Sequence, residues 1–124
     1  MNRYSTQEIL IGKDGQKNLK EATAAIVGLG ALGSLSAQLL ARAGIGKLIL
    51  IDRDYVELNN LHRQFFREED IGKAKAEAMA KLLKEINREV KVEAHFDNLD
   101  YTNAGKLLKA DLILDCTDNL ETRF

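Results

Sequence analysis

Short apolar runs alternate with longer amphipathic stretches along the 124-residue chain. Residues 24–27, 48–51 and 112–114 are continuously apolar, and residues 90–96 alternate between polar and apolar side chains. Continuous apolar runs of this length are typical of strands buried in a parallel sheet, and strict alternation is typical of a strand with two unlike faces. The pattern therefore predicts four strands, and it predicts that the last of them is buried.

The stretches between these runs have helical spacing. Residues 32–43 are apolar on most faces through Leu35, Leu39 and Leu40, and they stop at Gly44, which predicts a buried helix with a glycine cap. Residues 79–86 repeat apolar side chains at helical intervals with lysines between them, and residues 102–108 predict a short helix. Residues 5–21 predict one or two helical pieces broken by a turn at residues 13–15, so residues 1–22 are expected to form an N-terminal helical arm.

Alternation of strands and helices favours an α/β fold, a Rossmann-like doubly wound parallel sheet with helices on both faces. Its expected strand order is 3-2-1-4, which places the ends of the first and fourth strands side by side at the point where ligands bind in such sheets. The composition, 45% hydrophobic and 30% charged, suffices for one core and hence a single domain over residues 1–124. An apolar last strand requires a neighbour on its far side, so we expect the chain to be half of a larger fold, truncated at its C-terminal end, and to self-associate as a homodimer.

Charge and cysteine content narrow the class of partner and the compartment. A net charge of −1 gives no general attraction for nucleic acid or for anionic membranes. No run approaches the length of a membrane span, and the first residues have no apolar signal core. The one cysteine, Cys116, agrees with a reducing compartment, so a cytoplasmic location is expected.

A glycine motif follows the first predicted strand. Gly28, Gly30 and Gly33 have the spacing G-x-G-x-x-G and open the next helix, where the first glycine allows a tight turn, the second admits a phosphate and the third allows close packing. Backbone N–H groups at the start of that helix favour an anion. Asp52 ends the second strand, where a carboxylate commonly accepts hydrogen bonds from a ribose. The motif alone is compatible with a nicotinamide or flavin dinucleotide, with ATP, or with a turn that serves packing only.

Charged and amide side chains beyond the second strand favour a polyphosphate. Asn60 and Arg63 lie in a polar loop, where an arginine can bind phosphate through two parallel hydrogen bonds. Lys73 and Lys75 lie at the start of the next predicted helix, where the helix dipole disfavours a cation unless an anion is bound nearby. We favour Lys75 over Lys73 as the lysine that binds phosphate. A solvated polar surface remains the alternative interpretation for the loop.

Acidic side chains close the fourth predicted strand. A single carboxylate here is enough to hold Mg²⁺ between phosphates, and Asp118 is better placed for this than Asp115. Cys116 is interpreted as a small buried residue, because no neighbouring side chain would activate it. Neither His62 nor His95 is assigned a ligand role.

Taken together, these residues resemble the ThiF/MoeB/HesA group of adenylating enzymes, which are related to ubiquitin-activating enzymes. The resemblance extends along the whole chain, through Arg3-Tyr4-Ser5, Gln7, the loop from Val27 to Gly33, Asp52, Asp54, Asn60-Leu61-His62-Arg63-Gln64, Gly72, Lys75 and Cys116-Thr117-Asp118-Asn119. Members of this group are longer and carry further strands, often four zinc-binding cysteines and sometimes a catalytic cysteine. The family commonly has an arginine at the position of Thr6, which reaches the ATP of a partner subunit.

The resemblance implies that the chain is the ATP-binding half of an enzyme that uses ATP and Mg²⁺ to adenylate the C-terminal glycine of a small ubiquitin-like or sulfur-carrier protein ending in Gly-Gly. It implies that Asp52 holds the ribose, that Asp118 holds the metal, and that Arg63, Lys75 and Asp118 are the catalytic group. The full set of residues expected to contact the nucleotide is Gly28, Gly30, Ala31, Gly33, Asp52, Asp54, Asn60, Arg63, Gln64, Lys75, Asp118 and Asn119.

Other functions remain open at this stage. A nicotinamide-dependent oxidoreductase domain would use the glycine loop and Asp52 but would leave Arg63, Lys75 and Asp118 without a role. A non-catalytic nucleotide-binding module is compatible with the missing second half. A relative that activates a modified base in transfer RNA ranks lower, because the chain is not basic.

Overall fold

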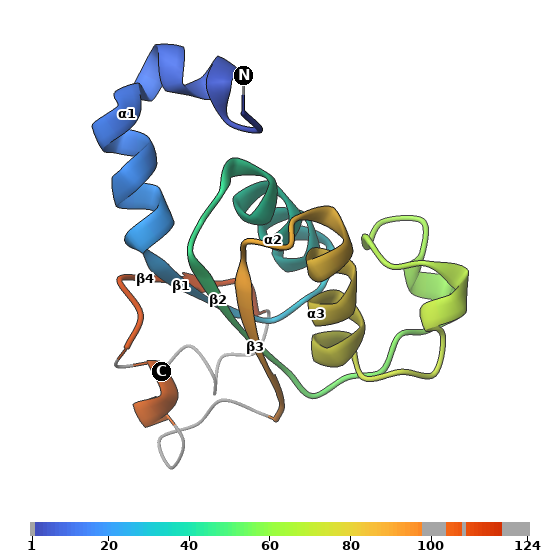
Figure 1. The fold of residues 1–124 in the computed structure, drawn as a ribbon. Helices are drawn as coiled ribbons and strands as arrows, with labels where there is room; N and C mark the ends of the chain where they lie inside the picture. The colour runs from blue at the N-terminus through green and yellow to red at the C-terminus, as the bar shows by residue number, and fades with distance from the viewer. Residues whose placement is uncertain (1, 98–103, 108, 118–124) are drawn as a thin grey trace.

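The computed structural model describes residues 2–97, 104–107 and 109–117. Within these residues the chain forms a four-stranded parallel sheet of order β3-β2-β1-β4, as predicted (Figure 1). The strands are β1 (Thr23–Val27), β2 (Lys47–Asp52), β3 (Lys91–Phe96) and β4 (Leu112–Asp115). The carboxyl ends of β1, β2 and β4 therefore meet at one edge of the sheet, where the predicted ligand site lies.

Helices cover the sheet unequally. The helices α2 (Ala31–Ala43) and α3 (Lys75–Ile86) pack on one face, where they enclose the larger core with alternate residues of β1 and β2. The other face of β1 and β2 is contacted by Leu107 and Ala110. The predicted helix over residues 102–108 corresponds to the short 3₁₀ helix η3 (Ala104–Leu107), and residues 102, 103 and 108 lie outside the described part. None of the helices in the described residues is both long and apolar enough to cross a bilayer.

The helix α2 ends at Gly44 as predicted, but it is buried on one face only. Gly44 has a φ of 96°, the left-handed conformation of a C-terminal glycine cap. The buried residues of α2 are the small ones, Gly33, Ser34, Ala37 and Ala41. Leu40 is partly buried against the core but Leu39 is 57% exposed, so the prediction of a buried helix holds for only part of its surface. The reason is steric, because only small side chains allow α2 to approach β1 and α3 this closely.

The N-terminal arm is the helix α1 (Ser5–Glu21), which has a kink at Gly12. Gly12 has a φ of 76°, so the break lies one residue before the predicted turn at residues 13–15. The arm is attached near the C-terminal ends of α2 and α3. Gln7 and Gln16 both donate to the carbonyl oxygen of Ala43, at 2.5 and 3.0 Å, and Arg3 donates to the carbonyl oxygen of Ile86 at 2.8 Å.

The strand β4 forms one edge of the described sheet. It pairs with β1 on one side, while its side chains at Leu112 and Ile113 are 51% and 48% exposed. The prediction of a buried fourth strand is therefore wrong for this chain, although the predicted position beside β1 is confirmed. The exposed apolar edge is a surface on which another strand or chain can pair.

Candidate functional site

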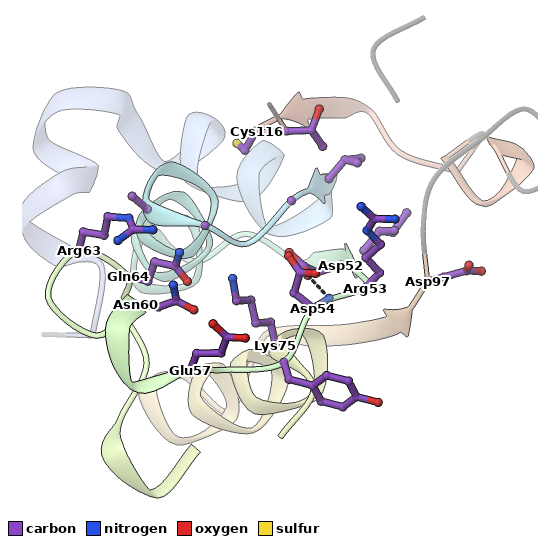
Figure 2. A pocket seen from close by; sticks show the side chains of 17 residues that line it. Asp52, Arg53, Asp54, Glu57, Asn60, Arg63, Gln64, Lys75, Asp97 and Cys116 are labelled. Atoms are coloured by element: carbon purple, nitrogen blue, oxygen red, sulfur yellow. Dashed lines mark hydrogen bonds between the residues drawn. The ribbon is translucent and has the colours of Figure 1, made fainter. Parts of the chain in front are cut away.

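A cavity of about 760 Å³ opens at the carboxyl ends of β1 and β2 (Figure 2). It lies between the glycine loop and residues 53–74, which connect β2 to α3 and are called the crossover segment below. Its wall contains nine of the twelve residues expected to contact the nucleotide. These are Gly28, Gly30, Ala31, Asp52, Asp54, Asn60, Arg63, Gln64 and Lys75. Gly33 supports the loop from behind the wall, and Asp118 and Asn119 lie outside the described residues.

The glycines of the loop have three different surroundings. Gly28 has a φ of +93°, which L side chains rarely adopt. A Cβ at position 33 would lie 1.8 Å from the carbonyl oxygen of Gly28, so this glycine is required for close packing of α2 against the loop. A Cβ at position 30 would meet only the Gln64 side chain, at 3.9 Å. The backbone at Gly30 is thus open to the cavity at the start of α2, where N–H groups and the helix dipole favour an anion.

Asp52 lines the cavity and binds the backbone on both sides of it. Its carboxylate accepts hydrogen bonds from the backbone N–H of Leu29 at 2.7 Å and of Asp54 at 2.6 Å, and the residue is only 9% exposed. Burial raises the pKa of the Asp52 carboxyl above its ordinary value, while the two N–H donors and the Lys75 charge act in the opposite direction. The glycine loop and the crossover segment are therefore both held by one carboxylate.

This raised pKa has a consequence for stability. The folded protein keeps the Asp52 proton at a pH at which the unfolded chain has lost it, so the stability contribution is complete below about pH 3.9 and is lost as pH rises through the raised pKa. We expect the unfolding free energy of the native chain, relative to that of Asp52→Asn, to fall as pH rises from about 4 to about 7. Urea unfolding at stepped pH measures this difference, and a difference that grows with pH would contradict it.

Lys75 is a buried cation that faces the cavity. It is the first residue of α3 and is 5% exposed, and its ammonium has no hydrogen-bond or ion-pair partner among the described residues. Figure 2 shows its side chain directed between Asp52 and the segment that carries Asn60 and Gln64. Lys73, by contrast, is exposed. The stem of Lys75 is buried while its ammonium faces the cavity, where the Asp52 carboxyl is its electrostatic neighbour, so a ligand with more than one negative charge would add to the attraction.

The crossover segment supplies the other polar groups. Asn60 ends the 3₁₀ helix η1 (Leu58–Asn60), and its carbonyl oxygen accepts from the backbone N–H groups of Arg63 and Gln64 at 3.2 and 2.9 Å. Arg63 is exposed and makes only long contacts, at 3.4 Å, to the Asn59 carbonyl and the His62 ring. Gln64 is 7% exposed and its Oε1 has no hydrogen-bond partner in the described part of the chain. These side chains are free to receive a ligand.

Several residues of the cavity wall were not anticipated from the sequence. They are Val27, Ile51, Arg53, Tyr55, Glu57, Asp97, Cys116 and Thr117. Tyr55 packs against Phe96 with ring centroids 5.1 Å apart, and both rings are about half exposed at the end of β3. Their places follow the same rule as the predicted residues, because each lies at or just beyond a strand end.

Cys116 and His95 have ordinary polar surroundings near the ends of β4 and β3. Cys116 is partly buried, and burial followed by the charge of Asp115 raises the pKa of its thiol, which disfavours a reactive thiolate. His95 lies 2.9 Å from the Glu93 carboxylate on β3. No group of three or more metal-ligating side chains occurs among residues 2–97 and the other described segments.

The fold and the cavity define a nucleotide-binding α/β domain with a glycine loop at one wall and cationic side chains at the other. The chain belongs to the ThiF family, whose family model matches residues 4–124. The predicted resemblance and the predicted fold are both confirmed.

Individual relatives give the same assignment. The chain is 46% identical over 127 residues to the sulfur carrier protein ThiS adenylyltransferase of Bacillus subtilis, and 43% identical over 126 residues to the adenylyltransferase and sulfurtransferase MOCS3 of Aedes aegypti. It aligns over 98% of its own length but spans only 38% and 29% of these proteins. Among solved structures it resembles E. coli tRNA N6-threonylcarbamoyladenosine dehydratase, TcdA, in complex with ATP, with a TM-score of 0.93 and 32% identity, over 98% of this chain and 51% of that one.

Proposed function

We propose that this chain is the ATP-binding part of a cytoplasmic adenylyltransferase that activates the C-terminal glycine carboxylate of a small sulfur-carrier protein. The observation that carries the proposal is the Lys75 ammonium, which faces the cavity from a buried stem, makes no hydrogen bond or ion pair with the described residues, and lies across from an open glycine loop. An anion with several negative charges satisfies both features, and a triphosphate supplies them. The ThiS adenylyltransferase relative and the ATP complex of TcdA support the choice of ATP and of adenylation.

The residues of the cavity divide between the parts of ATP. We assign Asp52 to the ribose hydroxyls, from which its carboxylate would accept hydrogen bonds, and the N–H groups at the start of α2 favour the phosphates. On the opposite wall Asn60 would donate hydrogen bonds to phosphate oxygens, and Arg63 and Lys75 would neutralise phosphate charge. Attack of a carboxylate on the α-phosphate needs alignment and charge neutralisation more than a protein nucleophile, and this wall provides both.

Magnesium fits this donor set. Thr117 lines the cavity, and the space beside Gly28 is closed by the Cys116 carbonyl and the Thr117 methyl, so the chain reaches the glycine loop immediately before Asp118. Mg²⁺ bound to phosphates takes only one or two protein carboxylates and keeps several waters. Asp118 remains our proposed ligand, and the ion would offset the negative charge of the phosphates.

The strength of the resemblances supports our choice of acceptor. Identity is 46% to the enzyme that acts on the carrier protein ThiS and 32% to the enzyme that acts on tRNA. The net charge of −1 also gives no general attraction for RNA. A carrier protein with a C-terminal Gly-Gly is therefore our proposed substrate, and an oxidoreductase role would leave the Lys75 ammonium without a partner.

Pyrophosphate exchange tests the proposed reaction. This chain would replace the matching region of the Bacillus subtilis ThiS adenylyltransferase, and exchange of labelled pyrophosphate into ATP would be measured with and without ThiS. We expect exchange that requires ThiS and is lost when its final glycine is removed. Exchange that is absent with ThiS, while the native enzyme remains active in the same assay, would contradict the proposal.

We also propose that the chain forms a homodimer. The apolar edge at Leu112 and Ile113 pairs with no further strand among the described residues, and Arg3 and Thr6 belong to an arm at the opposite end of the sheet from the cavity. A partner-supplied cation would therefore have to come from another copy. Sedimentation at about 0.1 mM, well above the dissociation constants typical of stable dimers, should show a dimer.

A lysine at the β4 edge provides the matched test. Ile113→Lys places a charge on the exposed edge and should shift the protein to a monomer, whereas Ile71→Lys changes an equally exposed isoleucine away from the sheet. A compact monomer of the unmodified chain, or dimers that resist Ile113→Lys, would count against β4 as the interface.

A further inference from the structure

A single buried hydroxyl joins the glycine loop to the segment that carries Arg63. Ser34 is 0% exposed and lies in the first turn of α2. Its Oγ donates to the carbonyl oxygen of Gly30 at 2.6 Å and accepts from the backbone N–H of Phe65 at 3.1 Å. The two segments are far apart in sequence, and this oxygen atom is in hydrogen-bond contact with both.

A second side chain of α2 holds the same residue of the crossover segment. Gln38 lies one turn after Ser34, and its Nε2 donates to the Phe65 carbonyl oxygen at 3.0 Å. Side chains at positions i and i+4 share one face of a helix, so Ser34 and Gln38 together hold both backbone polar groups of Phe65. We refer to Ser34 and Gln38 as the Phe65 clamp.

The position of the clamp is important because the segment has little regular structure of its own. Between Asp52 and Lys75, where every residue is described, the chain contains only the 3₁₀ helices η1 and η2 (Glu68–Asp70). Arg63 and Gln64 immediately precede Phe65 and line the cavity. Their distance from the glycine loop thus depends on how Phe65 is held against α2.

The hydrogen bond to the Gly30 carbonyl does not by itself explain why position 34 carries a hydroxyl group. The Gly30 carbonyl already accepts the backbone N–H of Ser34 at 2.9 Å, and the same buried face of α2 uses alanine at positions 37 and 41. The contact that needs an oxygen at position 34 is the one to the Phe65 N–H. We propose that Ser34 and Gln38 are positioning residues, which hold Arg63 and Gln64 at the distance from the glycine loop that a polyphosphate requires.

Nucleotide affinities test the clamp, and this part of the test rests on the proposed function. Calorimetry would compare ATP with Mg²⁺ against AMP for Ser34→Ala, with Ser36→Ala on the same helix as the matched control. Loss of one hydrogen bond that positions a charged group should weaken ATP about tenfold and AMP less than about twofold. Ser34→Thr retains the hydroxyl and should restore the affinity for ATP.

A double-mutant cycle separates positioning from a general loss of structure. If Ser34 acts through Arg63 and Gln64, the Ser34→Ala change should weaken ATP less in an Arg63→Ala background than in the native chain. Equal losses for ATP and AMP, or additive losses in the double variant, would overturn the proposal.

Amide hydrogen exchange at Phe65 gives a readout without any nucleotide. We expect faster exchange of the Phe65 N–H in Ser34→Ala than in Ser36→Ala. Unchanged protection would overturn the clamp even if ATP binds. If the unmodified chain fails to bind ATP while Phe65 exchange responds as expected, the proposed function fails and the clamp as a structural contact stands.

Discussion

Replacing Lys75 by methionine is expected to weaken ATP by about 1.5–3 kcal/mol, or roughly 10- to 150-fold, because one charge-assisted contact to phosphate is lost. Methionine keeps the unbranched stem of the buried lysine and removes only the ammonium. AMP should lose less affinity than ATP, since the proposed partners of Lys75 lie beyond the α-phosphate. Calorimetric titration of both nucleotides in Mg²⁺ measures the difference.

Three comparisons make this result specific. Lys73→Met removes an exposed lysine two residues earlier and should leave both affinities unchanged. Asp52→Ala should weaken AMP and ATP alike, because its proposed contact is to the ribose. Lys75→Met should also unfold at about the same urea concentration as the native chain, since the buried stem is retained and the ammonium that is removed faces the cavity. Equal losses for ATP and AMP in Lys75→Met would remove Lys75 from the phosphate site.

Gly33→Ala is expected to be the most destabilising single substitution in the glycine loop, at about 3 kcal/mol or more. The added Cβ would lie 1.8 Å from the Gly28 carbonyl oxygen, so α2 must move away from the loop. Urea unfolding followed by circular dichroism measures the cost.

Gly30→Ala is the matched control for that change. Gly30 has a φ of −74°, and a Cβ there would meet only the Gln64 side chain at 3.9 Å, so the fold should be retained. The methyl group would nevertheless occupy the space through which a phosphate reaches the backbone, so ATP should bind more weakly. If Gly30→Ala unfolds the protein and Gly33→Ala does not, the division of roles within the loop is wrong.

The features that could be predicted from sequence are those set by local pattern. Strands β1 and β2 are continuous apolar runs. The glycine spacing between β1 and α2 is typical of a tight turn followed by a closely packed helix. The order of the strands then brings Asp52 and the glycine loop together without further information. Lys75 was favoured over Lys73 on dipole grounds, and burial agrees with that choice.

The features that could not be predicted depend on packing between distant segments. Leu39 of α2 is exposed because Ala37 and Ala41 meet the sheet, and apolarity alone does not distinguish these faces. The contact between Ser34 and Phe65 spans 31 positions, so no local pattern reveals it. Tyr55 and Phe96 likewise meet only because the ends of β2 and β3 lie side by side.

The most direct measurement of the central claim is calorimetry of this chain with three titrants, ATP with Mg²⁺, ATP with EDTA, and NAD. The cavity predicts binding of ATP that is strengthened by Mg²⁺ and weakened in Lys75→Met. Binding of NAD that is tighter than that of ATP, with no response to Mg²⁺ or to the loss of the Lys75 ammonium, would contradict it.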